Sequence, residues 1–176
     1  QPFVKVSELT WPQIDKVMNV NLYGLLYMTK AFLPYLLRRP EAHIINISSM
    51  GGFLPVPGQT IYGASKAAVK LFTEGLHSEL LDTNVHVTVV FPGAIGTNIA
   101  QNSGAMTSEQ QAAQDTGKIK MTSPVRAAQT ILDGMESDQY RVLIGSDSKM
   151  MDFFYRLNPK GAAMLIYNQM KTLLAN

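Results

Sequence analysis

The chain has 176 residues, 46% of them hydrophobic and 16% charged, so it is long enough to bury a core as one globular domain. Its 15 Lys and Arg and 13 Asp and Glu leave a formal charge of +2, and the scattered cations argue against a nucleic-acid partner. The absence of cysteine excludes disulfides and thiolate metal sites and favours a reducing compartment, which we expect to be the cytoplasm.

The longest apolar stretches of the sequence are interrupted by Asn, Gly or Pro. None approaches the roughly 20 residues that cross a bilayer, so we expect a soluble protein without a membrane span. The sequence opens at Gln1 rather than at an initiating Met, and a leader or an upstream region could therefore precede it.

Two helices and a strand are predicted at the start of the chain. Thr10 and Gln13 form a capping-box pattern with Pro12 in the first turn, which indicates a short helix beginning there. Over residues 21–38, apolar side chains recur at three- and four-residue spacing, which predicts a second helix. The β-branched segment 43–48 is typical of a buried strand, and it ends at a Ser-Ser-Met-Gly-Gly loop.

A strand, a helix and a strand follow one another in the middle of the sequence. The helix is predicted over residues 60–81, and the apolar run 85–91 is predicted as the second strand, which Pro92 and Gly93 stop. This order is typical of a parallel βαβ unit with a right-handed crossover. The fold class is therefore predicted to be α/β with a parallel sheet.

The last third of the chain is predicted to be mostly helical. Residues 98–122 are polar and rich in Gly, Ser, Gln and Met, which favours a mobile loop. A helix is expected to start at Ser123-Pro124 and to run to Glu136, followed by a third short strand at 142–144. Residues 147–173 then form a helical tail that is broken near Pro159 and Gly161.

Polar residues are predicted to meet at one edge of the sheet. In a parallel α/β sheet, ligands bind beyond the carboxyl ends of the strands. Ser48 and Ser49 end the first strand, Tyr62 lies in the first turns of the next helix, and Pro92-Gly93 ends the second strand. Asn21 is expected at the same edge, because it begins the helix that runs back to the first strand.

Tyr62 and Lys66 are four residues apart and therefore share one helix face. A phenol with a pKa near ~10 serves as an acid or base around neutrality only if that pKa falls by roughly 3 units. One ammonium in a partly solvated site supplies part of this shift, so a second positive charge is needed.

Four segments resemble, in order and on their expected elements, the motifs of the short-chain dehydrogenase/reductase family. A Tyr-x-x-x-Lys spacing alone arises by chance in helix-rich chains, but here the resemblance extends over residues 1 to about 146. The four segments are Asn21-Leu22-Tyr23-Gly24, Ile45-Asn46-Ile47-Ser48-Ser49, Tyr62-Gly63-Ala64-Ser65-Lys66 and Pro92-Gly93-Ala94-Ile95-Gly96-Thr97.

The resemblance implies a Rossmann-like, doubly wound parallel sheet that is incomplete, with the last three strands and their flanking helices. The family's first strand and its Gly-rich turn, which holds the pyrophosphate, do not occur in this sequence, nor does the residue that selects between NAD and NADP. We therefore expect NAD or NADP as cofactor, and weak dinucleotide binding by these 176 residues alone. Residues 1–146 would be the C-terminal part of the dinucleotide-binding catalytic domain, and 147–176 a helical tail packed on it.

The resemblance also implies a role for each candidate catalytic residue. Tyr62 would donate or accept the proton of the substrate oxygen, and Lys66 would lower the pKa of Tyr62 and bind the nicotinamide ribose. Ser49, rather than Ser48, would donate a hydrogen bond to the substrate carbonyl. Asn21 would hold a water that joins Lys66 to solvent, and the oxidised nicotinamide would supply the second positive charge.

The loop after the second strand would contact the nicotinamide carboxamide. The contacts implied there are Pro92, Gly93, the backbone of Ile95 and the hydroxyl of Thr97, in addition to the cofactor contacts of Tyr62 and Lys66. Thr97 could equally be the cap of a following helix, and Asn21 could be a helix cap alone.

The implied reaction is reversible hydride transfer between NAD(P) and a secondary alcohol or ketone. The apolar loop Phe53-Leu54-Pro55-Val56-Pro57 favours a lipophilic substrate. The family commonly pairs its subunits through helices like those at 21–38 and 60–81, so a homodimer or homotetramer is expected. The alternative is a non-catalytic dimerisation or interaction module of the same fold; an epimerase or dehydratase is disfavoured by the Pro-Gly loop.

The three histidines His43, His77 and His86 lie at strand starts or on a helix, and their spacing matches no ligand pattern. They are interpreted as structural, and no metal site is predicted.

Overall fold

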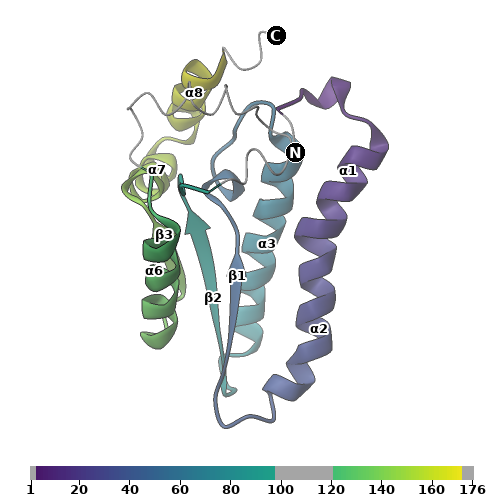
Figure 1. Cartoon of the computed structure of the whole chain (residues 1–176), viewed down its shortest axis with the longest axis vertical. Coiled ribbons are helices and arrows are strands. Elements are labelled where there is room, and N and C mark those ends of the chain that lie inside the picture. The colour runs from purple at the N-terminus through teal and green to yellow at the C-terminus, as the bar shows by residue number, and fades with distance from the viewer. Residues whose placement is uncertain (1–2, 98–120, 172–176) are drawn as a thin grey trace.

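A computed structural model describes residues 3–97 and 121–171 (Figure 1). Its centre is a parallel sheet in the order β1-β2-β3, built from Ala42–Ile47, Val85–Pro92 and Arg141–Ile144. The three predicted strands and their parallel arrangement are confirmed, each within one residue at either end. The helices lie on both sides of the sheet, with α2 and α3 on one side and α6 on the other.

The N-terminal helices form one continuous helical run rather than two. After a short 3-10 turn at Val6–Glu8, α1 (Trp11–Met18) passes through a π-helical turn at Asn19–Tyr23 into α2 (Gly24–Leu36). The Gln13 side chain accepts a hydrogen bond from the Thr10 N–H at 2.9 Å, as a capping box requires. The separate second helix predicted from residue 21 was therefore wrong, because the wider π turn carries the chain across without a break.

The sheet has an apolar layer on each face. On the α3 side (Thr60–Glu79), Ile44, Val85 and Val87 pack against Leu76 and Leu80. On the other side, α6 (Pro124–Glu136) covers Val90, Val142 and Ile144. Each fully buried aliphatic side chain contributes roughly 1.5–3 kcal/mol, so these two layers hold the strand ends in place.

The C-terminal tail consists of two helices, α7 (Ser146–Leu157) and α8 (Pro159–Met170). The break between them falls at Asn158, whose side chain accepts a hydrogen bond from the Gly161 N–H at 2.9 Å. The tail packs on the 3-10 turn and loop that follow β1, burying Leu54 against Met151, Ala162 and Ile166. The predicted loop at 98–122 lies almost entirely outside the described residues.

Within residues 3–97 and 121–171, the structure contains no helix that is both long and apolar enough to cross a bilayer.

Candidate active site

Ser48 and Ser49 follow β1 directly, and the structure gives the two hydroxyls different tasks. Ser48 is 2% exposed, and its hydroxyl donates to the Lys66 carbonyl at 2.8 Å, which ties the end of β1 to α3. Ser49 caps the 3-10 turn η3 (Met50–Gly52), where its Oγ accepts from the Gly51 N–H at 3.1 Å. The Ser49 hydroxyl hydrogen therefore stays available for another acceptor, whereas that of Ser48 is already used.

Gly51 marks the place where Ser49 and Tyr62 approach each other. A Cβ built on Gly51 would lie 3.5 Å from the Tyr62 ring and 3.6 Å from the Ser49 Oγ. Both residues are half-buried, and they come from the end of β1 and the first turns of α3. The predicted meeting of the serine and the tyrosine at the carboxyl edge of the sheet is therefore seen in the fold.

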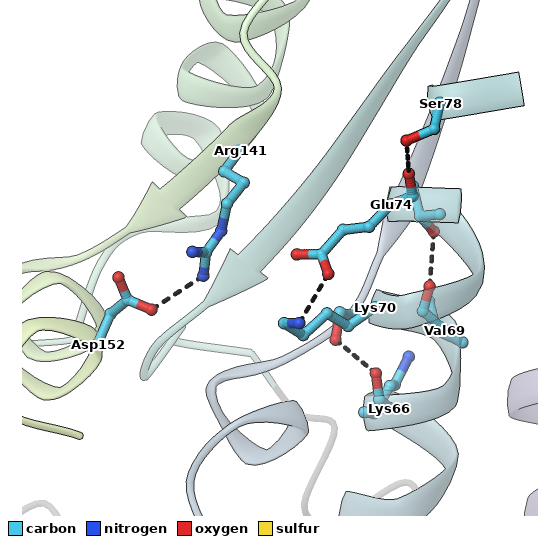
Figure 2. A network of polar contacts seen from close by, with 9 residues as sticks. Lys66, Val69, Lys70, Glu74, Ser78, Arg141 and Asp152 are labelled. Carbon is cyan, nitrogen blue, oxygen red and sulfur yellow. Dashed lines mark hydrogen bonds and ion pairs between the residues drawn. The ribbon is translucent and has the colours of Figure 1, made fainter. Parts of the chain in front are cut away.

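Lys66 lies one turn after Tyr62 on α3 and points back to the end of β1. Its ammonium donates to the Ile47 carbonyl at 3.0 Å and lies 6.0 Å from the centre of the Tyr62 ring. Burial lowers the pKa of Lys66 from its usual range. Figure 2 shows its side chain extending from α3, separate from the Lys70–Glu74 ion pair of 2.7 Å. The cation is thus held by backbone, not by a carboxylate.

Asn21 lies inside the π-helical turn. The prediction that it begins a helix was therefore wrong. Its side-chain amide donates to the Ser65 hydroxyl at 3.0 Å, and that hydroxyl donates to the Tyr62 carbonyl at 2.7 Å. Ser65 is fully buried. The chain of bonds joins Asn21 to the turn of α3 that carries Tyr62 and Lys66.

The segment after β2 pairs with the backbone of Thr122. The Ala94 carbonyl accepts from the Thr122 N–H at 2.9 Å, and the Gly96 N–H donates to the Thr122 carbonyl at 3.0 Å. Ile95 forms an isolated parallel bridge with Thr122. The backbone N–H of Thr97 donates to the Ile95 carbonyl at 2.8 Å. Thr97 is the last residue of this segment that the structure describes.

Asp147 is a residue of this edge that the sequence reasoning missed. Its carboxylate accepts from the Ala94 N–H at 2.7 Å. It fills the space in front of Gly93 and Gly145, where a Cβ on either glycine would overlap it. The signal was present as an acidic residue in the first turn of a helix that follows a strand and a glycine, a favourable position for a carboxylate.

Ser148, next to Asp147, is fully buried and donates from its hydroxyl to the Phe91 carbonyl at 2.9 Å. Two successive residues at the start of α7 therefore bond to β2 and to the loop that follows it, Ser148 to Phe91 and Asp147 to Ala94. Through these bonds the tail, together with β2, sets the path of the Pro92–Thr97 segment.

An apolar cavity of about 540 Å³ lies beside this edge. The Phe53–Val56 loop forms one wall, and Ala64, Ala67 and Leu71 of α3 form another, with Tyr155 from α7. Ser49, Tyr62 and Lys66 do not line it, but Gly51 does. The cavity therefore borders the cluster at Gly51 rather than enclosing it.

The carboxyl edge of the sheet thus brings together a serine whose hydroxyl hydrogen is available, a tyrosine, a half-buried lysine and a glycine-containing loop.

Three known proteins are similar to this chain in sequence or in fold. SadH of Mycobacterium tuberculosis is 38% identical over 157 residues, which are 86% of this chain and 57% of SadH.

Two solved structures are similar over most of the chain. A short-chain dehydrogenase from Burkholderia cenocepacia, in complex with NADP, has a TM-score of 0.76 at 25% identity, covering 93% of this chain and 63% of its own. A short-chain dehydrogenase/reductase from Burkholderia phymatum, in complex with NAD, has a TM-score of 0.68 at 26% identity, covering 80% and 56%. The expected Rossmann-like α/β fold is confirmed, and the expected cofactor class is the one that both of these proteins hold.

The chain spans less than two thirds of the length of SadH and of both solved relatives. A family model described as short chain dehydrogenase matches residues 1–108, which include the serine, tyrosine and lysine and the loop after β2. This chain therefore belongs to the short-chain dehydrogenase family.

Proposed function

We propose that the protein is an NAD(P)-dependent oxidoreductase that interconverts a secondary alcohol and a ketone through Ser49, Tyr62 and Lys66. The observation that carries this proposal is the approach of Ser49 and Tyr62 at Gly51, with the Lys66 ammonium 6.0 Å from the tyrosine ring. A hydroxyl donor, a phenol and a cation at one point are the groups needed to move a proton to or from an oxygen.

The described residues fit the nicotinamide end of the cofactor. The half-buried Lys66 ammonium has three N–H donors and uses one of them on the Ile47 carbonyl, so it retains donors for ribose hydroxyls. Gly93 follows the end of β2, where the Asp147 carboxylate occupies the space that a Cβ would take, and Ile95 and Thr97 lie further along the same loop. Pro92, Gly93, Ile95 and Thr97 would hold the carboxamide end together with Tyr62 and Lys66. Nicotinamide supplies the hydride donor or acceptor when it is bound.

Each side chain then has a distinct task. Tyr62 transfers the proton to or from the substrate oxygen. Ser49, whose Oγ already accepts from Gly51, donates its hydrogen to that oxygen and fixes its position. Lys66 supplies a positive charge 6.0 Å from the centre of the Tyr62 ring and binds the ribose hydroxyls. Asn21 acts through Ser65 and holds the turn of α3 that carries Tyr62. Its further proposed role is to hold a water that joins Lys66 to solvent.

The substrate is proposed to be lipophilic. The cavity that borders the cluster at Gly51 is lined mainly by apolar side chains, including Phe53, Leu54 and Val56. Such a lining favours a ketone with a hydrocarbon body over a charged sugar.

The test is the loss of turnover in Tyr62→Phe, measured on the protein as its gene encodes it. NADH and NADPH oxidation are followed spectrophotometrically with a panel of lipophilic ketones. A positioned acid or base contributes roughly 10²- to 10⁴-fold, so kcat should fall by about that factor while cofactor affinity changes little. Tyr167→Phe on α8, a partly exposed tyrosine away from the cluster, should keep wild-type turnover. Turnover in Tyr62→Phe within about twofold of wild type would refute the proposal.

A second measurement concerns the 176 residues alone. No Gly-rich turn of the kind that cradles a pyrophosphate follows a strand in this sequence, so titration with NADH or NADPH should show weak binding. Tight binding would contradict this expectation. Product analysis that shows conversion without net oxidation of NADH would favour an epimerase instead.

A non-catalytic interaction module is the alternative, and the exposed face of α2 favours it. Tyr27, Phe32 and Tyr35 are 69%, 53% and 66% exposed, and Leu71 on α3 is 69% exposed. Exposed apolar side chains on both helices support self-association through the helices predicted at 21–38 and 60–81, as a homodimer or homotetramer. Stable self-association together with inactivity of an intact Tyr62 protein would favour the module. The division into a catalytic part, 1–146, and a tail, 147–176, and the cytoplasmic location remain proposals.

A further inference from the structure

His43 and His86 lie side by side at the opposite edge of the sheet, where the strands begin. They are register partners in the parallel pair of β1 and β2, so their side chains leave the same face of the sheet. Their ring centres are 4.9 Å apart with an angle of 30° between the planes. The pairing of the two strands therefore brings together two imidazoles that lie 43 positions apart in the sequence.

Asp138 reaches the same point from the turn between α6 and β3. Its backbone is in the left-handed region, with φ of 49°, which is uncommon for a residue with a side chain. Its carboxylate lies 2.8 Å from the His86 Nδ1 and 3.5 Å from the His43 Nε2. The three ligand-type atoms lie within 4.8 Å of one another. Three separate segments of the chain thus converge on one polar cluster.

The cluster is incompletely satisfied as it stands. The His43 Nε2 is buried and forms no hydrogen bond in the described structure, since its 3.5 Å approach to Asp138 lacks hydrogen-bond geometry. A buried polar atom without a partner has lost its hydrogen bonds to water without replacement, which destabilises the fold. An electron-pair acceptor between His43, His86 and Asp138 would remove this cost.

We propose that His43, His86 and Asp138 bind one Zn²⁺ ion. Two imidazole nitrogens and one carboxylate are a known ligand set for zinc, with a fourth position left for water. With bonds of about 2.0–2.2 Å, tetrahedral ligands lie about 3.3 Å apart. The 2.8 Å separation between His86 and Asp138 must therefore open, and the wider separations, which extend to at most 4.8 Å, must shorten. Side-chain rotation allows this, because the Asp138 side chain is 58% exposed and that of His86 is 35% exposed.

The ion would link the starts of β1 and β2 to the turn that leads into β3. Its effect would therefore be on stability rather than on the proton transfer proposed above. His43 is the second residue of β1, which Ile47 ends, and Lys66 binds the Ile47 carbonyl at the other edge. The zinc proposal does not rest on the proposed function, and the failure of one would leave the other untouched.

The sequence suits a direct test, because it has no cysteine and only one histidine, His77, besides the two of the proposed site. Untagged protein is stripped with a chelator, and ZnCl₂ is titrated by calorimetry in a buffer that does not bind metal. We expect one ion per chain and a higher melting temperature with zinc, since a ligand that binds only the folded state stabilises it. MgCl₂ should not bind, because magnesium prefers oxygen ligands.

Three variants locate the site. His86→Gln and Asp138→Asn should each weaken zinc binding at least tenfold, while His77→Gln should bind like wild type. His77 is the matched control, since it lies on α3 against Tyr140, away from the cluster. Circular dichroism of each metal-free variant shows that it is folded before titration. Absence of zinc binding by the wild-type chain, or equal losses in His77→Gln and His86→Gln, would overturn the proposal.

Discussion

The two edges of the sheet hold their polar residues in different ways. At the carboxyl edge, side chains bond to backbone: Ser48 to the Lys66 carbonyl, Lys66 to the Ile47 carbonyl and Asp147 to the Ala94 N–H. At the amino edge, Asp138 and the two histidines interact with one another.

This difference bears on how each group of side chains can respond to a ligand. A side chain bonded to the main chain keeps its position for as long as the fold is intact, which suits chemistry that depends on orientation. Side chains whose polar atoms approach one another, and not the main chain, can rearrange around a bound ion. We therefore expect changes at the carboxyl edge to disturb the fold, and changes at the amino edge to have small effects on it.

The largest effect is expected for Gly52→Ala at the carboxyl edge. The added Cβ would lie 2.6 Å from the Ser48 Oγ and 2.9 Å from the Lys66 carbonyl oxygen, which belongs to the α3 backbone and cannot swing away. Overpacking of this kind should lower the free energy of unfolding by about 2–3 kcal/mol, measured by urea denaturation.

Gly75→Ala is the matched control for that substitution. Gly75 lies within α3, and a Cβ there would meet no atom within 4 Å. Alanine in an open helical position should stabilise the chain by up to ~1 kcal/mol. If Gly52→Ala were as well tolerated as Gly75→Ala, the tight contact between the Ser49-bearing turn and α3 would be refuted.

A smaller loss, about 1–2 kcal/mol, is expected for Gly93→Ala, because the group in its way is the Asp147 side chain rather than backbone. The double variant Gly93→Ala, Asp147→Ala should be less destabilised than the sum of the two single variants, since removing the carboxylate removes the overlap. Thermal or urea unfolding of all four proteins completes the cycle. Strict additivity would show that Asp147 does not pack against this loop.

The smallest effect is expected at the amino edge, for Asp138→Asn in chelator-treated protein. The Asp138 side chain is 58% exposed, and exposed ion pairs contribute about 0–1 kcal/mol. Asparagine also tolerates the left-handed backbone found at this position. The free energy of unfolding at pH 7 should therefore change by less than about 1 kcal/mol. A loss as large as that of Gly52→Ala would erase the contrast between the two edges.

Local patterns in the sequence predicted most of the elements. Apolar, β-branched runs marked the strands, Ser123-Pro124 marked the start of α6, and Pro159 marked the break in the tail that the structure places between α7 and α8. Asn21 shows where such patterns fail. Its helix was expected to begin there, but no local rule reports that a π turn joins it to the preceding helix.

The sequence by itself determined the parallel α/β class, the family, and the approach of Ser49, Tyr62 and Lys66, because strand ends and the four-residue helical spacing follow from local order. Only the tertiary structure decided what Asp147 and the His43, His86 and Asp138 cluster contact. Asp147 meets Ala94, 53 residues away in sequence, and the histidines meet through strand register. Contacts between distant segments depend on how strands pair and where turns end, and no spacing within one segment encodes them.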